Sequence, residues 1–338
     1  MTGEMSSRKK KGLQALANSY GVIAALAIDQ RSALRKLFAE ASGRPAEEVP
    51  TEWLIEFKEK VSKILTPHAS AILLDPEFGL PAARMRDSDA GLILAYEVSG
   101  YDQDLPGRLP RTLTGMTVAK LQEDGADAVK ALLYYCPSSK AGINVMKQDW
   151  VTRIGEECLK ADIPFFLELV SYHDDMDEKS EAFARRKPEI VKRSIEEFCK
   201  PLYAVDVLKV GVPVNMNFVE SRTLLRSGAV YTRAEAILHF RQASQAATLP
   251  FLYLSEGVSN ETFVHALELA GEAGCDFSGV LCGRATWQDG VPVFVQRGAA
   301  ALEGWLEEEG VRNIQNVNAH LGPARPWSER VASVPGGR

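Results

Sequence analysis

The stretch DVLKVGVPVN, Asp206–Asn215, decides the fold, because it places a lysine inside an otherwise apolar run. Such a continuous apolar run is typical of a parallel strand that is buried on both faces. An unpaired ammonium group is costly to bury. Lys209 must therefore pair with a carboxylate, point into a cavity or stay partly neutral, and a neutral lysine is a nucleophile toward carbonyl carbons.

Seven further short apolar runs surround this one along the chain. They are Gly21–Asp29, Ser70–Gly79, Gly91–Glu97, Asp127–Tyr135, Ile163–Val170, Leu249–Gly257 and Phe277–Ala285. Segments with helical periodicity lie between most of them, most clearly at Trp53–Leu65, Val151–Ala161, Arg185–Lys200, Thr232–Ala247 and Asn260–Gly274. This order predicts an α/β fold, a single-domain (β/α)8 TIM barrel. An open doubly wound sheet is the alternative, but its glycine-rich dinucleotide fingerprint is missing.

The 338 residues contain no long linker rich in Pro, Gly or Ser, which favours one domain. We expect a helical or irregular lead-in at residues 1–20, the barrel at 21–310, and a C-terminal helix with an irregular tail at 311–338. The net charge of −6 argues against nucleic acid or an anionic membrane as a partner. The chain has five cysteines, an odd number without a CxxC pair, and its N-terminus does not resemble a secretory signal. Together these features predict a cytoplasmic protein.

Polar residues recur at or near the ends of the apolar runs, where a barrel of this kind carries its active site. They are Asp29, Gln30, Arg31, Asp75, Glu77, Glu97, Lys130, Glu168, Lys209, Ser255, Glu256, Gly283 and Arg284. Lys130 and Lys209 would repel each other if both were charged, and this repulsion would lower the pKa of one and leave it nucleophilic. The alternative is that Lys209 is a structural lysine paired with a buried carboxylate.

Two carboxylates have two interpretations each. Glu168 could be the counter-ion of either lysine, or the general acid and base that Schiff-base chemistry requires. Asp29 precedes a helical pattern and could simply be its N-cap.

The loops after the seventh and eighth runs predict a phosphate site. Gly257 and Gly283 would let backbone N–H groups approach an anion, and Arg284 would supply positive charge. The alternative is two tight turns with a surface arginine.

The histidines do not indicate a metal site. Only His173 of the five falls just past a strand end, and no HxxxH or HxH pair occurs. We therefore expect neither a metal nor another cofactor.

The ordered stretches together resemble the tagatose 1,6-bisphosphate aldolase family of class I aldolases. The resemblance spans about Gly12 to Trp327 and rests on ALAIDQRSAL, SAILLDPEFGLPA, GLILAYEVSGYD, DAVKALLYY, IPFFLELVSY, DVLKVGVPVN, LPFLYLSEGVS and GVLCGRATW. It implies a (β/α)8 barrel, a role in carbohydrate metabolism, and metal-free cleavage of a phosphorylated sugar to dihydroxyacetone phosphate and glyceraldehyde 3-phosphate. By analogy with such barrels, a homodimer or homotetramer is expected.

The resemblance also implies roles for individual residues. Lys209 matches the Schiff-base lysine and Glu168 the acid and base carboxylate. Asp29, Gln30 and Lys130 match polar residues around the substrate, and Ser255, Gly257, Gly283 and Arg284 match the region that holds the dihydroxyacetone phosphate end. For the phosphate at the sixth carbon, Arg31 and Arg84 are candidates.

Two positions depart from the family pattern. Gly211 stands where the family has an acidic residue, and Glu256 stands where it has a small one. These departures bear on the substrate, so fructose 1,6-bisphosphate and sulfofructose 1-phosphate are alternatives to tagatose 1,6-bisphosphate. A metal-dependent aldolase or isomerase on the same barrel, and a sugar-phosphate sensor without turnover, are the other interpretations.

Overall fold

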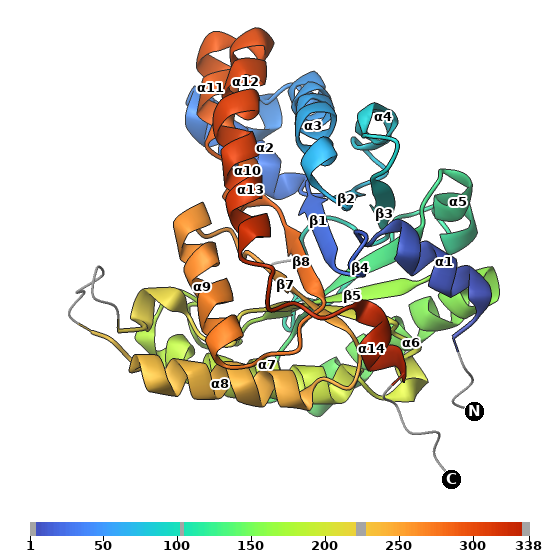
Figure 1. The fold of residues 1–338 in the computed structure, drawn as a ribbon, viewed down its shortest axis with the longest axis vertical. Coiled ribbons are helices and arrows are strands. Elements are labelled where there is room, and N and C mark those ends of the chain that lie inside the picture. The colour runs from blue at the N-terminus through green and yellow to red at the C-terminus, as the bar shows by residue number, and fades with distance from the viewer. Residues whose placement is uncertain (1–4, 102–104, 221–227, 333–338) are drawn as a thin grey trace.

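Eight parallel strands close into a barrel, in the computed structural model that describes residues 5–101, 105–220 and 228–332 (Figure 1). The strands are β1 (Ile23–Ala27), β2 (Ala71–Leu74), β3 (Gly91–Ala95), β4 (Ala128–Tyr135), β5 (Phe165–Ser171), β6 (Val207–Gly211), β7 (Phe251–Leu254) and β8 (Gly279–Cys282). Each strand pairs with the next one in sequence, and β8 returns to pair with β1. The predicted (β/α)8 barrel is confirmed, and all eight predicted runs contain a strand.

Helices connect the strands and surround the barrel (Figure 1). They are α1 (Ser7–Ala15), α2 (Ser32–Ser42), α3 (Thr51–Leu65), α4 (Leu80–Met85), α5 (Val118–Glu123), α6 (Ala141–Ala161), α7 (Glu181–Phe198), α8 (Arg233–Ala246), α9 (Asn260–Glu272), α10 (Arg284–Trp287), α11 (Gly290–Arg297), α12 (Ala299–Trp305), α13 (Val311–Ala319) and α14 (Trp327–Ala332). Shorter helical turns are η1 (Ala46–Glu48), η2 (Thr66–His68), η3 (Pro201–Tyr203), η4 (Met216–Phe218) and η5 (Leu306–Gly310).

Helix α6 begins well before the predicted start at Val151. Its first half buries the polar side chains of Asn144 and Lys147 beside the apolar Ile143 and Trp150. Polar residues on the buried face weaken the apolar stripe from which a helix is predicted.

The alternation of side chains along the strands decides which residues face the barrel interior. Ala128, Phe166 and Val207 belong to the apolar cluster that fills the interior, whereas Leu208 and Val210 belong to the cluster beneath the helices. Two residues further along each strand, a side chain points the same way. Lys130, Glu168 and Lys209 therefore also point inward, one layer closer to the C-terminal ends of the strands.

Helices α1 and α14 close the opposite end of the barrel. Leu13, Leu16 and Trp327 join the interior apolar cluster, and the Trp327 backbone N–H donates to the Gly21 carbonyl over 3.0 Å. In Figure 1 these two helices lie beside the chain ends. Within residues 311–338, where we expected a C-terminal helix and an irregular tail, Trp327–Ala332 is helical, and burial of the indole holds this segment. Residues 1–4 and 333–338 of the predicted lead-in and tail lie outside the described part of the chain.

Candidate active site

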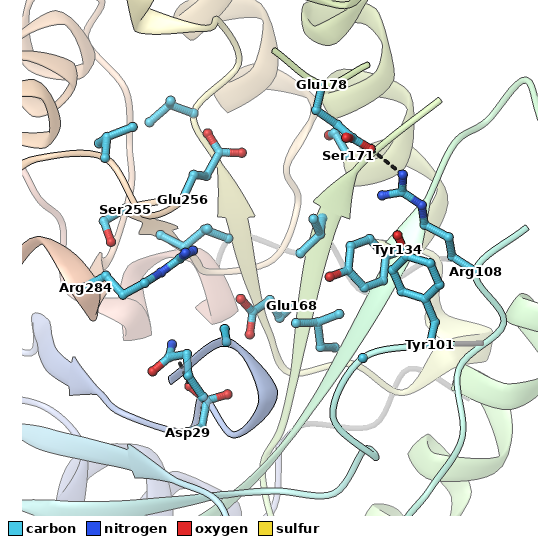
Figure 2. A pocket seen from close by; sticks show the side chains of 18 of the residues that line it. Asp29, Tyr101, Arg108, Tyr134, Glu168, Ser171, Glu178, Ser255, Glu256 and Arg284 are labelled. Atoms are coloured by element: carbon cyan, nitrogen blue, oxygen red, sulfur yellow. Dashed lines mark hydrogen bonds and ion pairs between the residues drawn. The ribbon is translucent and has the colours of Figure 1, made fainter. Parts of the chain in front are cut away.

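A cavity of about 450 Å³ opens at the C-terminal ends of the strands. Its lining includes Asp29, Gln30, Glu168, Ser255 and Arg284, which come from strand β5 and from the segments that follow β1, β7 and β8 (Figure 2). The predicted site residues at these positions, distant in sequence, therefore meet in one pocket. A barrel produces this convergence because all parallel strands end on the same rim.

Lys130 lies at the floor of this site and is surrounded by carboxylates. Its Nζ is 2.8 Å from Asp29 Oδ2, 2.8 Å from Glu97 Oε1 and 2.8 Å from Glu168 Oε2, and the side chain is fully buried. Burial alone would lower the pKa of Lys130, but the three carboxylates outweigh it and hold the pKa well above its usual range. Lys130 is therefore a permanent cation.

Glu168 links the two buried lysines through one oxygen. Glu168 pairs with Lys209 in the register of β5 and β6, and its Oε2 lies 2.9 Å from Lys209 Nζ and 2.8 Å from Lys130 Nζ. Lys209 is 3% exposed. Of the alternatives for Lys209, the structure shows a lysine paired with a buried carboxylate, and that carboxylate lines the pocket. A proton could pass between the Lys209 amine and this carboxylate over one hydrogen-bond length.

Asp29 is a charged member of this cluster and does not cap a helix. Helix α2 begins at Ser32, and its N-cap residue is Arg31, whose side chain makes no capping hydrogen bond. Burial would raise the pKa of Asp29, but attraction by Lys130 and Lys209 outweighs it, so the pKa lies well below its usual range. Its carboxylate is ionised at neutral pH.

Gln30 presents an unused acceptor in the pocket wall. Its Oε1 is buried and has no hydrogen-bond partner among the described residues, while its Nε2 donates to Asp29 Oδ1 over 3.3 Å. A buried polar atom without a partner is costly, so this oxygen is suited to receive a hydroxyl from a ligand.

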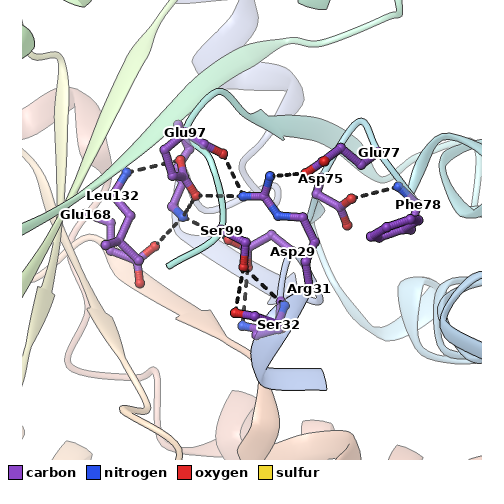
Figure 3. A network of polar contacts seen from close by, with 12 residues as sticks. Asp29, Arg31, Ser32, Asp75, Glu77, Phe78, Glu97, Ser99, Leu132 and Glu168 are labelled. Atoms are coloured by element: carbon purple, nitrogen blue, oxygen red, sulfur yellow. Dashed lines mark hydrogen bonds and ion pairs between the residues drawn. The ribbon is translucent and has the colours of Figure 1, made fainter. Parts of the chain in front are cut away.

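Arg31 lines the pocket, as predicted, and is held by other protein groups (Figure 3). Its Nη1 donates to Glu77 Oε2 over 2.5 Å, and its Nη2 donates to the Glu97 carbonyl over 2.7 Å. Burial would lower the pKa of Arg31, but these carboxylates raise it. Arg31 therefore orients Glu97, whose carboxylate contacts Lys130 and accepts the Leu132 N–H over 3.1 Å. We assigned no role to Glu97 from sequence, although its place at a strand end was the available signal.

Arg284 lies against the backbone of Gly257. Gly257 has a φ of +76°, and a Cβ at this position would collide with the Arg284 guanidinium. At Gly283 a Cβ would lie 2.7 Å from the Ala27 carbonyl oxygen. Both positions therefore require glycine. Gly257 needs it for its positive φ and for the close approach of Arg284, and Gly283 needs it only for the close approach of the Ala27 carbonyl. The hydroxyl-bearing Ser255 lines the pocket beside them.

The two departures from the family pattern touch each other. The Glu256 carboxylate occupies the space above Gly211, where any Cβ would collide with it, and Glu256 itself has a φ of +50°. Lys187 of α7, buried and lining the pocket, lies 2.6 Å from Glu256 Oε2. The negative charge is therefore neutralised locally. We missed Lys187, although it lies on the apolar stripe of its helix between Phe183 and Ile190.

The wall opposite Arg284 carries Arg108, Tyr101, Tyr134 and Glu178 (Figure 2). We had not predicted a role for Arg108 or Glu178, since they lie in loops without a strand-end signal. Arg84, a predicted candidate for a phosphate contact, is exposed on α4 and does not line the pocket.

The described residues contain neither a metal-binding cluster nor a membrane-spanning helix. No group of three or more His, Cys, Asp or Glu side chains is arranged there to hold a metal ion. Across the same residues, no helix combines the length and apolarity needed to cross a bilayer.

A closed (β/α)8 barrel with a charged pocket at the carboxyl ends of its strands defines the class of barrel enzymes. A family model described as "DeoC/LacD family aldolase" matches residues 23–289. The chain belongs to this DeoC/LacD aldolase family.

Two tagatose 1,6-diphosphate aldolases are similar to this chain over nearly its whole length. Tagatose 1,6-diphosphate aldolase 2 of Enterococcus faecalis is 49% identical over 97% of this chain and 98% of the relative. Tagatose 1,6-diphosphate aldolase of Staphylococcus haemolyticus is 47% identical over 94% of this chain and 96% of the relative.

Solved structures of more distant proteins share the fold. Fructose-bisphosphate aldolase from Plasmodium falciparum, in complex with TRAP and an inhibitor, superimposes with a TM-score of 0.66 at 13% identity and covers 94% of this chain and 97% of its own. A Schiff-base-forming fructose-1,6-bisphosphate aldolase gives a TM-score of 0.54 at 16% identity, covering 90% of this chain and 100% of its own.

Proposed function

We propose that this protein is a class I aldolase that cleaves tagatose 1,6-bisphosphate to dihydroxyacetone phosphate and glyceraldehyde 3-phosphate through a Schiff base on Lys209. The observation that carries the proposal is the pair of buried lysines that share one oxygen of Glu168. The names of the Enterococcus and Staphylococcus relatives support the choice of sugar.

The first step forms the Schiff base. The Lys209 amine, neutral when it reacts, attacks the C2 carbonyl of the ketose, and the C2 oxygen leaves as water to give an iminium. Glu168 Oε2, 2.9 Å from Lys209 Nζ, accepts the ammonium proton and returns a proton to the departing hydroxyl. Lys130 remains a cation beside them and, with the ionised Asp29, keeps Glu168 oriented.

The second step breaks the carbon chain. The iminium draws the electron pair of the C3–C4 bond toward nitrogen while the C4 hydroxyl gives its proton to the Glu168 carboxylate, which is ionised again after the first step. Glyceraldehyde 3-phosphate then leaves and an enamine stays on Lys209. Protonation of C3 and hydrolysis of the resulting iminium release dihydroxyacetone phosphate and restore the amine. Asp29, close to Lys130 and Glu168, assists the proton transfers.

The substrate's first phosphate lies against Arg284. This side chain, together with the Ser255 hydroxyl and backbone N–H groups at Gly257 and Gly283, forms the anion-binding end of the pocket. The free oxygen of Gln30 accepts a sugar hydroxyl. Because the phosphate is held, the C2 carbonyl is positioned against Lys209. Part of the binding energy is thus used to orient the two reacting groups.

The remaining features of the proposal concern the whole protein. The reaction requires no metal or other cofactor, because the iminium itself is the electron sink. We expect the enzyme to act in the cytoplasm as a homodimer or homotetramer.

The test is borohydride trapping with dihydroxyacetone phosphate in EDTA, followed by peptide mass spectrometry. We expect an adduct on Lys209 in the wild type and none in Lys209→Met. No adduct, or one on Lys130, would refute the Schiff-base assignment. Loss of trapping in EDTA with recovery on adding a divalent metal would indicate the metal-dependent alternative. Binding of tagatose 1,6-bisphosphate without cleavage would indicate a sensor.

A further inference from the structure

Arg108 lies on the pocket wall across from Arg284. In Figure 2 the two arginines lie on opposite sides of Glu168, which marks the reacting centre. Arg108 belongs to the connection between β3 and α5, whereas Arg284 follows β8. A cavity of about 450 Å³ between them has room for a six-carbon sugar that carries a charged group at each end.

Three tyrosine rings surround the Arg108 guanidinium at cation–π distance. Its central carbon lies 4.9 Å from the ring centroid of Tyr101, 5.4 Å from that of Tyr134 and 4.7 Å from that of Tyr172. Beside these rings the Arg108 Nη2 lies 2.5 Å from a carboxylate oxygen of Glu178, so an N–H donor of the guanidinium remains available to an anion. The rings thus fix the direction in which Arg108 donates.

The backbone beneath Arg108 is fixed as well. Gly107 and Arg108 both have positive φ, at +88° and +49°, and Arg108 has a Cβ that disfavours this conformation. The Gly107 carbonyl accepts a hydrogen bond from the Tyr172 hydroxyl over 3.1 Å, and the Ile143 side chain fills the space that a Cβ at Gly107 would need. A strained residue held this firmly is typical of a functional position.

An acidic side chain occupies the donor edge of Arg108 in the structure. Glu178, from the loop between β5 and α7, places its Oε1 2.5 Å from Arg108 Nη2. Glu178 is 40% exposed at its side chain, so its carboxylate can leave the arginine for water at little cost. A phosphate dianion carries more charge than a carboxylate and matches the guanidinium fork with two oxygens.

We propose that Arg108 is a second anion subsite, which binds the phosphate at the sixth carbon of the ketose after that phosphate displaces Glu178. This inference rests on the proposed function, since it assigns the far end of the same substrate. It explains why the pocket carries an arginine on each side of the lysine pair.

The test compares two substrates that differ only at the far end. Tagatose 1,6-bisphosphate carries both phosphates, and tagatose 1-phosphate lacks the second one. For Arg108→Met we expect kcat/KM to fall about 100-fold with the bisphosphate and less than 3-fold with the monophosphate. Arg108→Lys keeps the charge without the bidentate fork and should lose about 10-fold with the bisphosphate. Equal losses with both substrates, or no loss with the bisphosphate, would overturn the proposal.

A second variant leaves the tyrosine cage intact. Glu178→Gln removes the competing charge, so we expect KM for the bisphosphate to fall several-fold and KM for the monophosphate to stay unchanged. An unchanged or higher KM for the bisphosphate would refute the displacement of Glu178. Arg84→Met is the matched control, because it removes an exposed arginine outside the pocket and should alter neither substrate.

The proposed function is tested independently of this subsite. Dihydroxyacetone phosphate carries a single phosphate and binds at the Arg284 end, so its trapping on Lys209 should be normal in Arg108→Met. Failure of trapping in the wild type would refute the Schiff-base mechanism. Normal trapping in Arg108→Met without substrate discrimination would refute only the role of Arg108.

Discussion

A single oxygen of Glu168 lies within 3 Å of two lysine ammonium positions, and no other side chain in the described pocket has this double contact. Proton relay and counter-ion, the two alternatives that the sequence left open for Glu168, are therefore compatible in one geometry. Lys130 already has two further carboxylates, whereas Glu168 is the single ion-pair partner of Lys209 among the described residues. The carboxylate is thus better placed to exchange a proton with Lys209.

Replacing Glu168 tests the relay. For Glu168→Gln we expect kcat for bisphosphate cleavage to fall at least about 100-fold, because the amide cannot accept the proton of the Lys209 amine. Steady-state cleavage assays and the rate of borohydride labelling with dihydroxyacetone phosphate measure the effect. Labelling of Lys209 should become slow but still occur. Turnover within 3-fold of the wild type would assign the relay to another group.

The Glu256 side chain packs directly on Gly211, so substitutions at the two positions should have coupled effects on stability. A methyl group at Gly211 would collide with the Glu256 carboxylate and disturb its pairing with Lys187. We expect Gly211→Ala to lower the free energy of unfolding by about 1–3 kcal/mol in urea titrations. The double variant Gly211→Ala with Glu256→Ala should recover part of this loss, since the two sites are in contact. Additive losses would contradict the coupling.

At the scale of elements, helix α6 carries a buried base behind the Arg108 wall. Lys147 is fully buried and donates from Nζ to the Tyr172 hydroxyl over 2.9 Å. Burial lowers the pKa of Lys147 to about 7. Because this helix starts well before its apolar stripe, the sequence pattern did not reveal the residue.

The lowered pKa of Lys147 predicts a pH dependence of stability. In the folded protein Lys147 loses its proton near pH 7, whereas in the unfolded chain it does so near pH 10.5. The unfolded state therefore binds more protons between these values, so the contribution of Lys147 to stability increases as pH rises from about 7 toward 10.5, by at most about 1.4 kcal/mol per pH unit. Urea titrations from pH 6 to 10 should show this rise in the wild type relative to Lys147→Met. Parallel curves for the two proteins would contradict it.

At the scale of the whole molecule, the barrel separates a stabilising end from a reacting end. The C-terminal strand ends hold the charged pocket, and α1 and α14 cover the other end with Leu13, Leu16 and Trp327. This division lets substitutions at one end leave the chemistry at the other unchanged.

Trp327→Ala tests this division. Removing the buried indole should cost about 3–5 kcal/mol of unfolding free energy, measured by urea denaturation, while KM for the bisphosphate stays within 2-fold of the wild type. Tyr20→Ala is the matched control, since Tyr20 is 80% exposed and should change stability by less than about 0.5 kcal/mol. A large change in KM with Trp327→Ala would show that the two ends are coupled.

The sequence by itself determined the barrel and the residues at its strand ends. Eight apolar runs with helical patterns between them have few alternative folds, and a strand that ends in polar residues identifies the rim of the pocket. Lys130, Glu168, Lys209, Asp29 and Arg284 could therefore be named before any contact was known.

Only the tertiary structure decided which of these groups touch and which loop residues join them. It paired Arg31 in the pocket wall with Glu77 and Glu97, and it brought Lys187 to Glu256. It also placed the tyrosines around Arg108. The physical reason is that the alternation along a strand sets, from the local sequence, which way each side chain points. The path of a loop and the partner of a buried charge depend instead on elements that are distant in sequence and pack against them.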